Sequence, residues 1–379
     1  MVGNDDQLKD LYIDMTKFFA SGDLEGKTIA GWVIVKKLAA PNRLKNETGG
    51  NFSTCYTVEK NGIVAFMKVL DYQKIMMNHG SLTPQIMQQA STEFNYEKKL
   101  SEYCVNRKIS KIVHYVESGD ENLDGYLVTG SVSYIIYEMA DGDVRRVLDL
   151  SSKTELAAKI HSLSVKLKSL HDVSVGINQL HTNDISHQDI KPSNILSVKG
   201  ESKIGDLGRS ICFNPMVACP YPAYFNGDRN YAAPECFYPD FVSNVGNLYQ
   251  IDNYMLGGLI TYYITGLTFN AMMNNYLPED LQFSRFSKIQ SLPYRDVLPD
   301  MINAYQKALK DFEDEIPVDD VKAGLVSLVS YLCNPDPTHR GHPKNVAVSS
   351  RTPNHDLHRT IQELDVLYKK AELALLIKK

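Results

Sequence analysis

The pattern of apolar residues changes once along this chain, near residue 140, and the change limits the folds that the chain can adopt. Before it lie short segments rich in Val, Ile and aromatic residues and bounded by Gly or Asn. These predict the strands of an antiparallel sheet: Trp32–Leu38, Cys55–Val58, Ile63–Leu70, Lys111–Glu117 and Tyr134–Glu138. The helix formers of Thr83–Cys104, with Pro84 near their start, predict one main helix among these strands.

After residue 143 the apolar residues recur at three- or four-residue steps, from Ile160 through Leu180, as on one face of a helix. The most apolar stretch, Met255–Leu267, contains three glycines and is shorter than the ~18 to 20 residues of a membrane span, so we expect a buried helix there. No repeat of fixed period supports a solenoid or a propeller. The chain is therefore predicted to be an α+β protein, with a sheet-rich lobe, a mainly helical lobe and a ligand cleft between them.

Composition narrows the class further. The 379 residues are 43% hydrophobic and 22% charged, which excludes a disordered or fibrous chain and suggests about two domains. A net charge of -5 without a long basic run gives no reason to expect nucleic acid as the main partner. The six cysteines form no C-x-x-C pair and predict reduced thiols of a cytoplasmic protein. The acidic, amphipathic start lacks the order of a secretory signal, so we expect no export by that route.

The same patterns divide the chain into four parts. We expect a helical extension at 1–26, the sheet-rich lobe at 27–138, a connector with the helical lobe at 139–350 and an amphipathic helix at 351–379. The alternating spacing of four and three from Leu357 to Leu375 favours docking of this last helix on the helical lobe. A coiled coil or dimer seam is the alternative, and the oligomeric state stays open.

The strongest functional signal is the segment His187–Leu196, which reads HQDIKPSNIL and is followed by KIGDLG at 203–208. Phosphoryl transfer needs a carboxylate that orients an attacking hydroxyl and accepts its proton, and it needs oxygen ligands for magnesium. The pattern D-x-K-x-x-N followed by D-x-G supplies these groups. A polar turn that happens to hold two Asp explains the whole string less well.

These segments resemble the catalytic loop and the magnesium loop of the eukaryotic-type serine/threonine protein kinases. The resemblance implies the bilobal kinase fold, ATP and Mg²⁺ as cofactors, and a Ser or Thr of a protein as the phosphate acceptor. It makes Asp189 the catalytic base and Lys191 the residue that neutralises charge on the transferred phosphate. It makes Asn194 and Asp206 the magnesium ligands.

Upstream, the strand VAFMKVL at 64–70 resembles the one that carries the phosphate-contacting Lys, here Lys68. A buried Lys needs an anionic partner. Glu97 on the expected helix is our choice, with Glu93 one turn earlier as the rival. Phe66 stands where a small residue usually faces adenine, and this departure puts the standard shape of the base pocket in doubt.

Two further segments complete the nucleotide site that the resemblance implies. The loop of Gly49, Gly50, Asn51, Phe52 and Ser53 is similar to the family's glycine loop, although its outer glycines are replaced; an ordinary hairpin turn is the alternative. The strand YIIYEMA at 134–140 resembles the hinge, where the backbone of Glu138 and Ala140 would bind adenine, Tyr137 stands at the gatekeeper position and Asp143 would reach the ribose. An ordinary edge strand, with a solvated carboxylate at Asp143, is the alternative.

The second lobe also carries structural parts of the kinase pattern. Glu235, in YAAPE, resembles the Glu that ends the activation segment, and Arg340 resembles its ion-pair partner. Asp252 and Gly257 match the buried helix that anchors the catalytic loop.

Several departures from the family pattern shape the functional prediction. Gln188 replaces the Arg that normally pairs with a phosphorylated activation loop, and Ser210 is the only Ser or Thr between Asp206 and Glu235. We therefore expect an enzyme that is not switched on by phosphorylation of this segment. Asp228, where Thr is more usual, would accept a hydrogen bond from Lys191. The forms HQD, DLG and YAAPE suggest a bacterial or mobile-element branch.

We therefore predict an ATP- and Mg²⁺-dependent kinase that phosphorylates Ser or Thr of proteins, including itself. A nucleotide-binding pseudokinase scaffold is one alternative, although Lys68, Asp189, Asn194 and Asp206 are all retained. A small-molecule kinase of the aminoglycoside or choline type is the other, although that type lacks the Ala-Pro-Glu segment. Transfer of phosphate to protein distinguishes the three.

Overall fold

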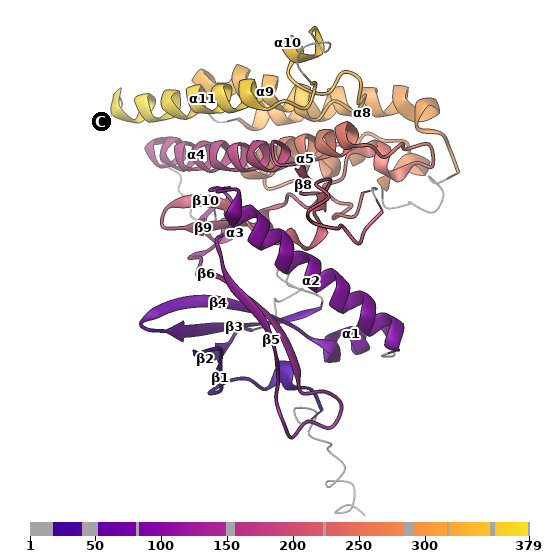
Figure 1. Ribbon diagram of the computed structural model, residues 1–379. Helices are drawn as coiled ribbons and strands as arrows, with labels where there is room; N and C mark the ends of the chain where they lie inside the picture. The colour runs from indigo at the N-terminus through magenta and orange to yellow at the C-terminus, as the bar shows by residue number, and fades with distance from the viewer. Residues whose placement is uncertain are drawn as a thin grey trace, which may run out of the picture. The chain divides into compact units, whose positions relative to one another are not determined.

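The computed structural model describes residues 18–39, 52–80, 83–148, 156–222, 225–283, 291–316, 318–348 and 353–377. The chain divides into two compact units, drawn in Figure 1. The first consists of Met1–Glu102 with His114–Met139, and the second of Tyr103–Val113 with Ala140–Lys379. A sheet dominates the described part of the first unit and helices dominate the second, so the expected α+β class is confirmed.

The first unit is built on a six-stranded antiparallel sheet with the strand order β1-β2-β3-β4-β6-β5. At the β3–β4 hairpin, Asn61 and Gly62 both have positive φ, 54° and 76°, which is the backbone of the tight Asn-Gly turn. This turn sets the register that pairs Lys68 with Cys55. The strands are β1 (Thr28–Ile29), β2 (Trp32–Lys37), β3 (Ser53–Lys60), β4 (Ile63–Leu70), β5 (Tyr115–Asn122) and β6 (Ser131–Glu138).

Apolar side chains cover both faces of this sheet. One cluster joins alternate residues of β3, β4 and β6, including Met67, to Ala20 and Leu24 of the segment that precedes β1. The other cluster joins Ile135 to Phe94 of α2 (Pro84–Asn106) and to residues of α1 (Tyr72–His79). The side chains of β4 alternate between the two faces, so Lys68 lies on the face opposite Met67.

The second unit is a stack of helices with two small sheets. Figure 1 shows α11 alongside α4, and α11 packs on both α4 and α9. The strand β9 pairs with β10 and β7, and β8 pairs with β11. None of the helices within the described ranges is long and apolar enough to cross a membrane. The helices are α3 (Val144–Leu148), α4 (Leu156–His181), α5 (Val245–Thr265), α6 (Phe269–Asn274), α8 (Tyr294–Glu315), α9 (Asp319–Leu332), α10 (Pro343–Val346) and α11 (His358–Ile377), and the strands are β7 (Gly142–Asp143), β8 (Ile185–Ser186), β9 (Ile195–Val198), β10 (Glu201–Ile204) and β11 (Ile211–Cys212).

The expected buried helix at 255–267 is part of α5, which is buried over nearly its whole length. Asn244 caps its start by accepting a hydrogen bond from the backbone N–H of Asn247, and Gly266 ends it in the left-handed conformation with φ 78°. At the end of the described chain, Leu364, Leu367 and Ala371 of α11 are buried. The structure thus shows docking of this helix on the helical unit.

Two expected elements differ from the observed ones. The strand expected at 111–117 begins only at Tyr115, because the backbone groups of Lys111 and Val113 instead bond to Ile204 of β10 at 2.9 Å each. The Lys111 side chain also pairs with Asp172, at 2.8 Å, which fixes this turn in the second unit. Most of the extension expected at 1–26 lies outside the described residues, and residues 18–26 hold one short 3-10 turn at Ala20–Gly22.

Candidate active site

An ion pair joins Lys68 of β4 to Glu97 of α2. The distances from Lys68 Nζ to the two carboxylate oxygens are 2.7 and 2.9 Å, and Glu97 is 4% exposed. Glu97, and not Glu93, is the carboxylate that pairs with Lys68, and Glu93 accepts a hydrogen bond from Gln89 on the exposed side of the helix. Glu97 is three residues from the buried Phe94, so both face the sheet. The Tyr137 hydroxyl donates to Glu97 at 3.3 Å.

Asp71 binds the end of the expected phosphate loop through its backbone and the start of β3 through its buried carboxylate. Gly49, Gly50 and Asn51 lie outside the described residues. The Asp71 backbone N–H donates to Phe52 O at 2.9 Å, and the Thr54 hydroxyl donates to the Asp71 carboxylate.

Asp71 also links this strand start to two other segments. Its carboxylate caps α1 by accepting from the N–H of Gln73, at 3.0 Å, and it accepts from the Ser21 hydroxyl at 3.1 Å. Lys74, on the first turn of α1, donates to Ser53 O at 2.6 Å. This network was not expected from the sequence, although an Asp between a strand and a helix is a recognisable N-cap signal.

The expected hinge residues have partners within their own units. In the first unit the Glu138 backbone N–H donates to His114 O at 2.9 Å, and its carboxylate accepts from His114 N at 2.8 Å. In the second unit the Asp143 carboxylate is held by Arg145 through the guanidinium, with the shortest bond 2.7 Å. To bind ribose, the Asp143 carboxylate would therefore have to give up a bond to Arg145 or accept hydrogen bonds from both. The roles of Glu138, Ala140 and Asp143 stay predictions.

The carboxylate of Asp252 in α5, which is fully buried, accepts hydrogen bonds from the segment 186–188 and so fixes its position. Oδ2 of Asp252 accepts from His187 N and from the Ser186 hydroxyl, both at 2.8 Å, and from His181 Nε2 at 2.9 Å. Oδ1 accepts from Gln188 N at 2.8 Å. Gln188 itself has φ 69°, a strained conformation for a non-glycine residue that these bonds hold in place.

This anchored loop presents Asp189 with both carboxylate oxygens engaged. Oδ1 accepts from the Asp228 backbone N–H at 3.0 Å. Oδ2 accepts from Asn194 Nδ2 at 3.0 Å and lies 3.0 Å from Lys191 Nζ. Asp189 is 6% exposed, so its carboxylate is largely shielded from water and its orientation is set by the protein.

Lys191 lies between two carboxylates. Its Nζ is 3.0 Å from Asp189 and 3.4 Å from Asp228, which confirms the predicted contact with Asp228. Burial alone would lower the pKa of Lys191, but the charges of Asp189, Asp228 and Asp206 outweigh it and raise the pKa above its ordinary value. Lys191 is therefore a cation throughout the neutral pH range. Asn230 holds the Asp228 carboxylate in place through its backbone and side-chain N–H groups, at 3.0 Å each.

Asn194 and Asp206 supply the oxygen donors that Mg²⁺ prefers. Asn194 Nδ2 donates to the backbone O and to the carboxylate of Asp189. This orients the amide so that its Oδ1 points away from Asp189. Asp206 has φ 58° and ψ 76°, and the adjacent Gly205 N–H donates to Asn194 O at 2.8 Å, which ties the two segments together. Within the described ranges no three His, Cys, Asp or Glu gather as a self-sufficient metal site. A carboxylate and an amide fit an ion that takes its other ligands from phosphate and water.

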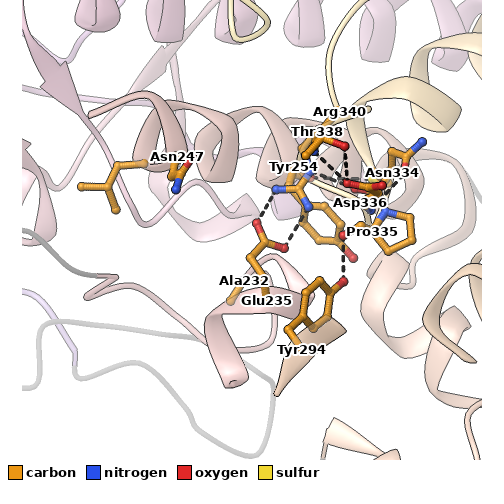
Figure 2. Close-up of polar contacts among 12 residues, drawn as sticks. Ala232, Glu235, Asn247, Tyr254, Tyr294, Asn334, Pro335, Asp336, Thr338 and Arg340 are labelled. Atoms are coloured by element: carbon orange, nitrogen blue, oxygen red, sulfur yellow. Dashed lines mark hydrogen bonds and ion pairs between the residues drawn. The ribbon is translucent and has the colours of Figure 1, made fainter. Parts of the chain in front are cut away.

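A second buried ion pair, drawn in Figure 2, joins Glu235 to Arg340. The guanidinium is fully buried and donates to both carboxylate oxygens, at 2.6 and 2.9 Å, and its Nε donates to Asn334 O. It also lies over the Tyr254 ring, 5.0 Å from the centroid. Burial opposes the charge, yet the Glu235 carboxylate holds the pKa of Arg340 above its ordinary value. This pair is structural, because it fixes the end of the segment that begins at Asp206.

The fold and these two sets of residues define a phosphotransferase class: a sheet-borne Lys–Glu pair in one unit and an Asp–Lys–Asn loop with a following Asp in the other. The protein kinase domain family matches residues 47–349, and the chain belongs to this family.

Three eukaryotic relatives illustrate the similarity. Serine/threonine-protein kinase SSN3 of Mycosarcoma maydis is 31% identical over 37% of this chain and 19% of its own length. Serine/threonine-protein kinase par-4 of Caenorhabditis elegans is 31% identical over 28% of this chain and 16% of its own length. Calmodulin-binding receptor-like cytoplasmic kinase 3 of Arabidopsis thaliana is 29% identical over 43% of this chain and 30% of its own length. The matches cover under a third of each relative, and they give no support to the bacterial or mobile-element branch.

Proposed function

We propose that this protein is a serine/threonine protein kinase that transfers the γ-phosphate of ATP, with Mg²⁺, to protein hydroxyls, its own included. The observation that carries the proposal is the arrangement at Asp189, whose two oxygens are fixed by Asp228 N, Asn194 Nδ2 and Lys191 Nζ. Membership of the protein kinase domain family and the names of the relatives support it.

In this proposal Asp189 orients the acceptor hydroxyl and takes its proton as the bond to phosphorus forms. Lys191 offsets negative charge on the transferred group, and Lys68, oriented by Glu97, binds the nucleotide phosphates. Asn194 and Asp206 would hold Mg²⁺, which when bound neutralises charge on the phosphate oxygens. The backbone of 49–53 would cover the phosphates, and Glu138, Ala140 and Asp143 would bind the nucleoside.

The second part of the proposal is that phosphorylation of the 206–235 segment does not switch the enzyme on. Ser210 is fully buried, and its hydroxyl donates to His187 O at 3.3 Å. Gln188 carries no charge to attract a phosphate, and its amide donates to Leu248 O at 3.3 Å. Ser210→Ala should therefore retain transfer activity. If the enzyme transferred phosphate only when Ser210 was itself phosphorylated, this part of the proposal would be wrong.

The protein is further proposed to work in the reducing cytoplasm. None of the six cysteines forms a disulfide, and burial raises the pKa of Cys104 to about 12, which makes this thiol unreactive.

The deciding experiment measures transfer of labelled γ-phosphate from ATP and Mg²⁺ to the protein itself and to generic protein substrates. Asp189→Ala should lower the rate about a hundredfold to ten-thousandfold, the range for general acid–base groups. Asp124→Ala, which changes an exposed Asp of the β5–β6 connection, is the matched control and should leave the rate unchanged. Nucleotide binding without any transfer would favour the scaffold, and transfer only to small hydroxyl compounds would favour the small-molecule kinase.

A further inference from the structure

A groove on the second unit, outside the proposed active site, is lined by several positively charged side chains. It has a volume of about 350 Å³ and runs between α9, α10 and α11. Figure 1 shows these helices above α4, which packs on β8 and β10 with its other side. Gly324 of α9 lies close to α11, since a Cβ at this position would be 2.5 Å from Leu367 Cδ2.

Three cations line this groove: Lys344, Arg359 and Lys370. In the part of the chain that the structure describes, no carboxylate forms an ion pair with any of them. The adjacent Lys369 differs, since it pairs with Asp365 at 2.6 Å and does not line the groove. A local excess of positive charge in a chain of net charge -5 indicates a site for an anion.

The one acid of the groove, Glu363, is already engaged. It accepts from the Tyr331 hydroxyl at 2.8 Å and lies 3.0 Å from His342 Nε2. Nδ1 of His342 accepts from Lys344 N, so Nε2 carries the proton and donates to Glu363. Among the described residues Glu363 forms no ion pair with Lys344, Arg359 or Lys370, and three cations against one carboxylate leave the lining with a net positive charge.

The guanidinium of Arg359 is held in one orientation by a buried neighbour. Its Nε donates to Asn345 Oδ1 at 2.9 Å, and Asn345, which is 1% exposed, is itself fixed by a bond to Asp356 O. This leaves the terminal nitrogens of the guanidinium for a second contact. A planar guanidinium flanked by two ammonium groups suits a doubly charged phosphate better than a single carboxylate.

We infer that this groove binds a phosphorylated peptide segment through phosphoserine or phosphothreonine. A peptide suits the site because Val366, 52% exposed, offers an apolar contact beside the cations. Nucleic acid suits it less, because the charge is confined to one groove rather than spread along a face. The inference does not depend on the proposed transfer activity.

The test measures binding of fluorescent peptides with a central phosphoserine and randomised flanks to the full chain. Unphosphorylated and glutamate-containing twins serve as comparison ligands. The double variant Lys344→Ala, Lys370→Ala should bind the phosphopeptides roughly ten- to hundredfold more weakly, since two charge-assisted contacts are removed. Arg359→Lys keeps the charge but loses the paired N–H donors of the guanidinium, and this variant should bind more weakly than the wild type. Lys369→Ala is the matched control and should bind normally.

Three results would overturn the inference: equal binding of the unphosphorylated or glutamate twin, binding that the double variant retains, or tighter binding of a single-stranded oligonucleotide at the same groove. Both lysines are exposed, so the double variant should keep its unfolding temperature, and this is measured alongside. The titrations are repeated with Asp189→Ala, which should lower transfer strongly and leaves the groove intact. A failure of the groove is thereby separated from a failure of the kinase proposal.

Discussion

Asp252→Asn tests the claim that one buried carboxylate sets the position of the catalytic loop. The best-fitting Asn would place its single oxygen where Oδ2 lies, keeping the contacts from Ser186, His187 and His181. Its Nδ2 would then face the Gln188 N–H, which donates to Oδ1 in the wild type, and this buried donor would lose its acceptor.

The magnitude follows from these contacts. One orphaned buried donor costs about 1–3 kcal/mol, and each of the three remaining bonds loses about 1 kcal/mol when its acceptor becomes neutral. Removing a buried charge offsets part of this sum. We therefore expect the free energy of unfolding to fall by about 2–4 kcal/mol. The rate of phosphate transfer should fall about ten- to hundredfold, because Asp189 is displaced.

Denaturant unfolding measures the first quantity, and the label-transfer assay measures the second. Asp296→Asn, at an exposed carboxylate of α8, is the matched control and should change stability by less than about 0.5 kcal/mol. The reasoning fails if Asp252→Asn unfolds at the same denaturant concentration as the wild type.

Two further predictions concern the second unit. Arg340→Met leaves Glu235 buried without its counter-charge and should lower the free energy of unfolding by about 3–5 kcal/mol; Glu235→Leu combined with Arg340→Met should recover much of this loss in the same measurement. Burial, aided by the charge of His181, lowers the pKa of His355 from 6.5 to about 4. Between these values the unfolded chain binds more protons, so stability should be complete above pH 6.5 and should decrease as the pH falls through about 4. His355→Phe keeps an aromatic ring beside Tyr249, and its stability should depend less on pH over this range; an unchanged slope would rule out His355 as the titrating group.

The parts of the site that the sequence predicted are those whose signals are local. Glu97 lies on the expected helix next to the strand that carries Lys68, and strand alternation places Lys68 opposite the Met67 face. Asp189, Lys191 and Asn194 lie within six residues of one another in the catalytic-loop motif, so their side chains are expected to be in contact.

The parts that it missed depend on contacts between distant segments. Nothing near Lys111 in the sequence indicates that its backbone will bond to Ile204 rather than extend the strand. Likewise, Ser21 and Asp71 are 50 residues apart, so only the folded chain shows that they meet. The family pattern that suggests ribose for Asp143 says nothing of its bonds to Arg145 two residues later.

The folded first unit begins earlier in the chain than the match to the family, because the segment before β1 is part of its core. The match begins at residue 47, but Ala20, Leu24, Trp32 and Ile34 belong to the cluster that covers one face of the sheet. A chain starting at residue 47 would lack β1 and β2, expose Tyr56 and Met67 to water and turn β3 into an unprotected edge strand. Such a truncated chain would carry every expected catalytic residue and yet be prone to aggregate. For expression and domain-swap work, the folding unit therefore starts no later than Ala20.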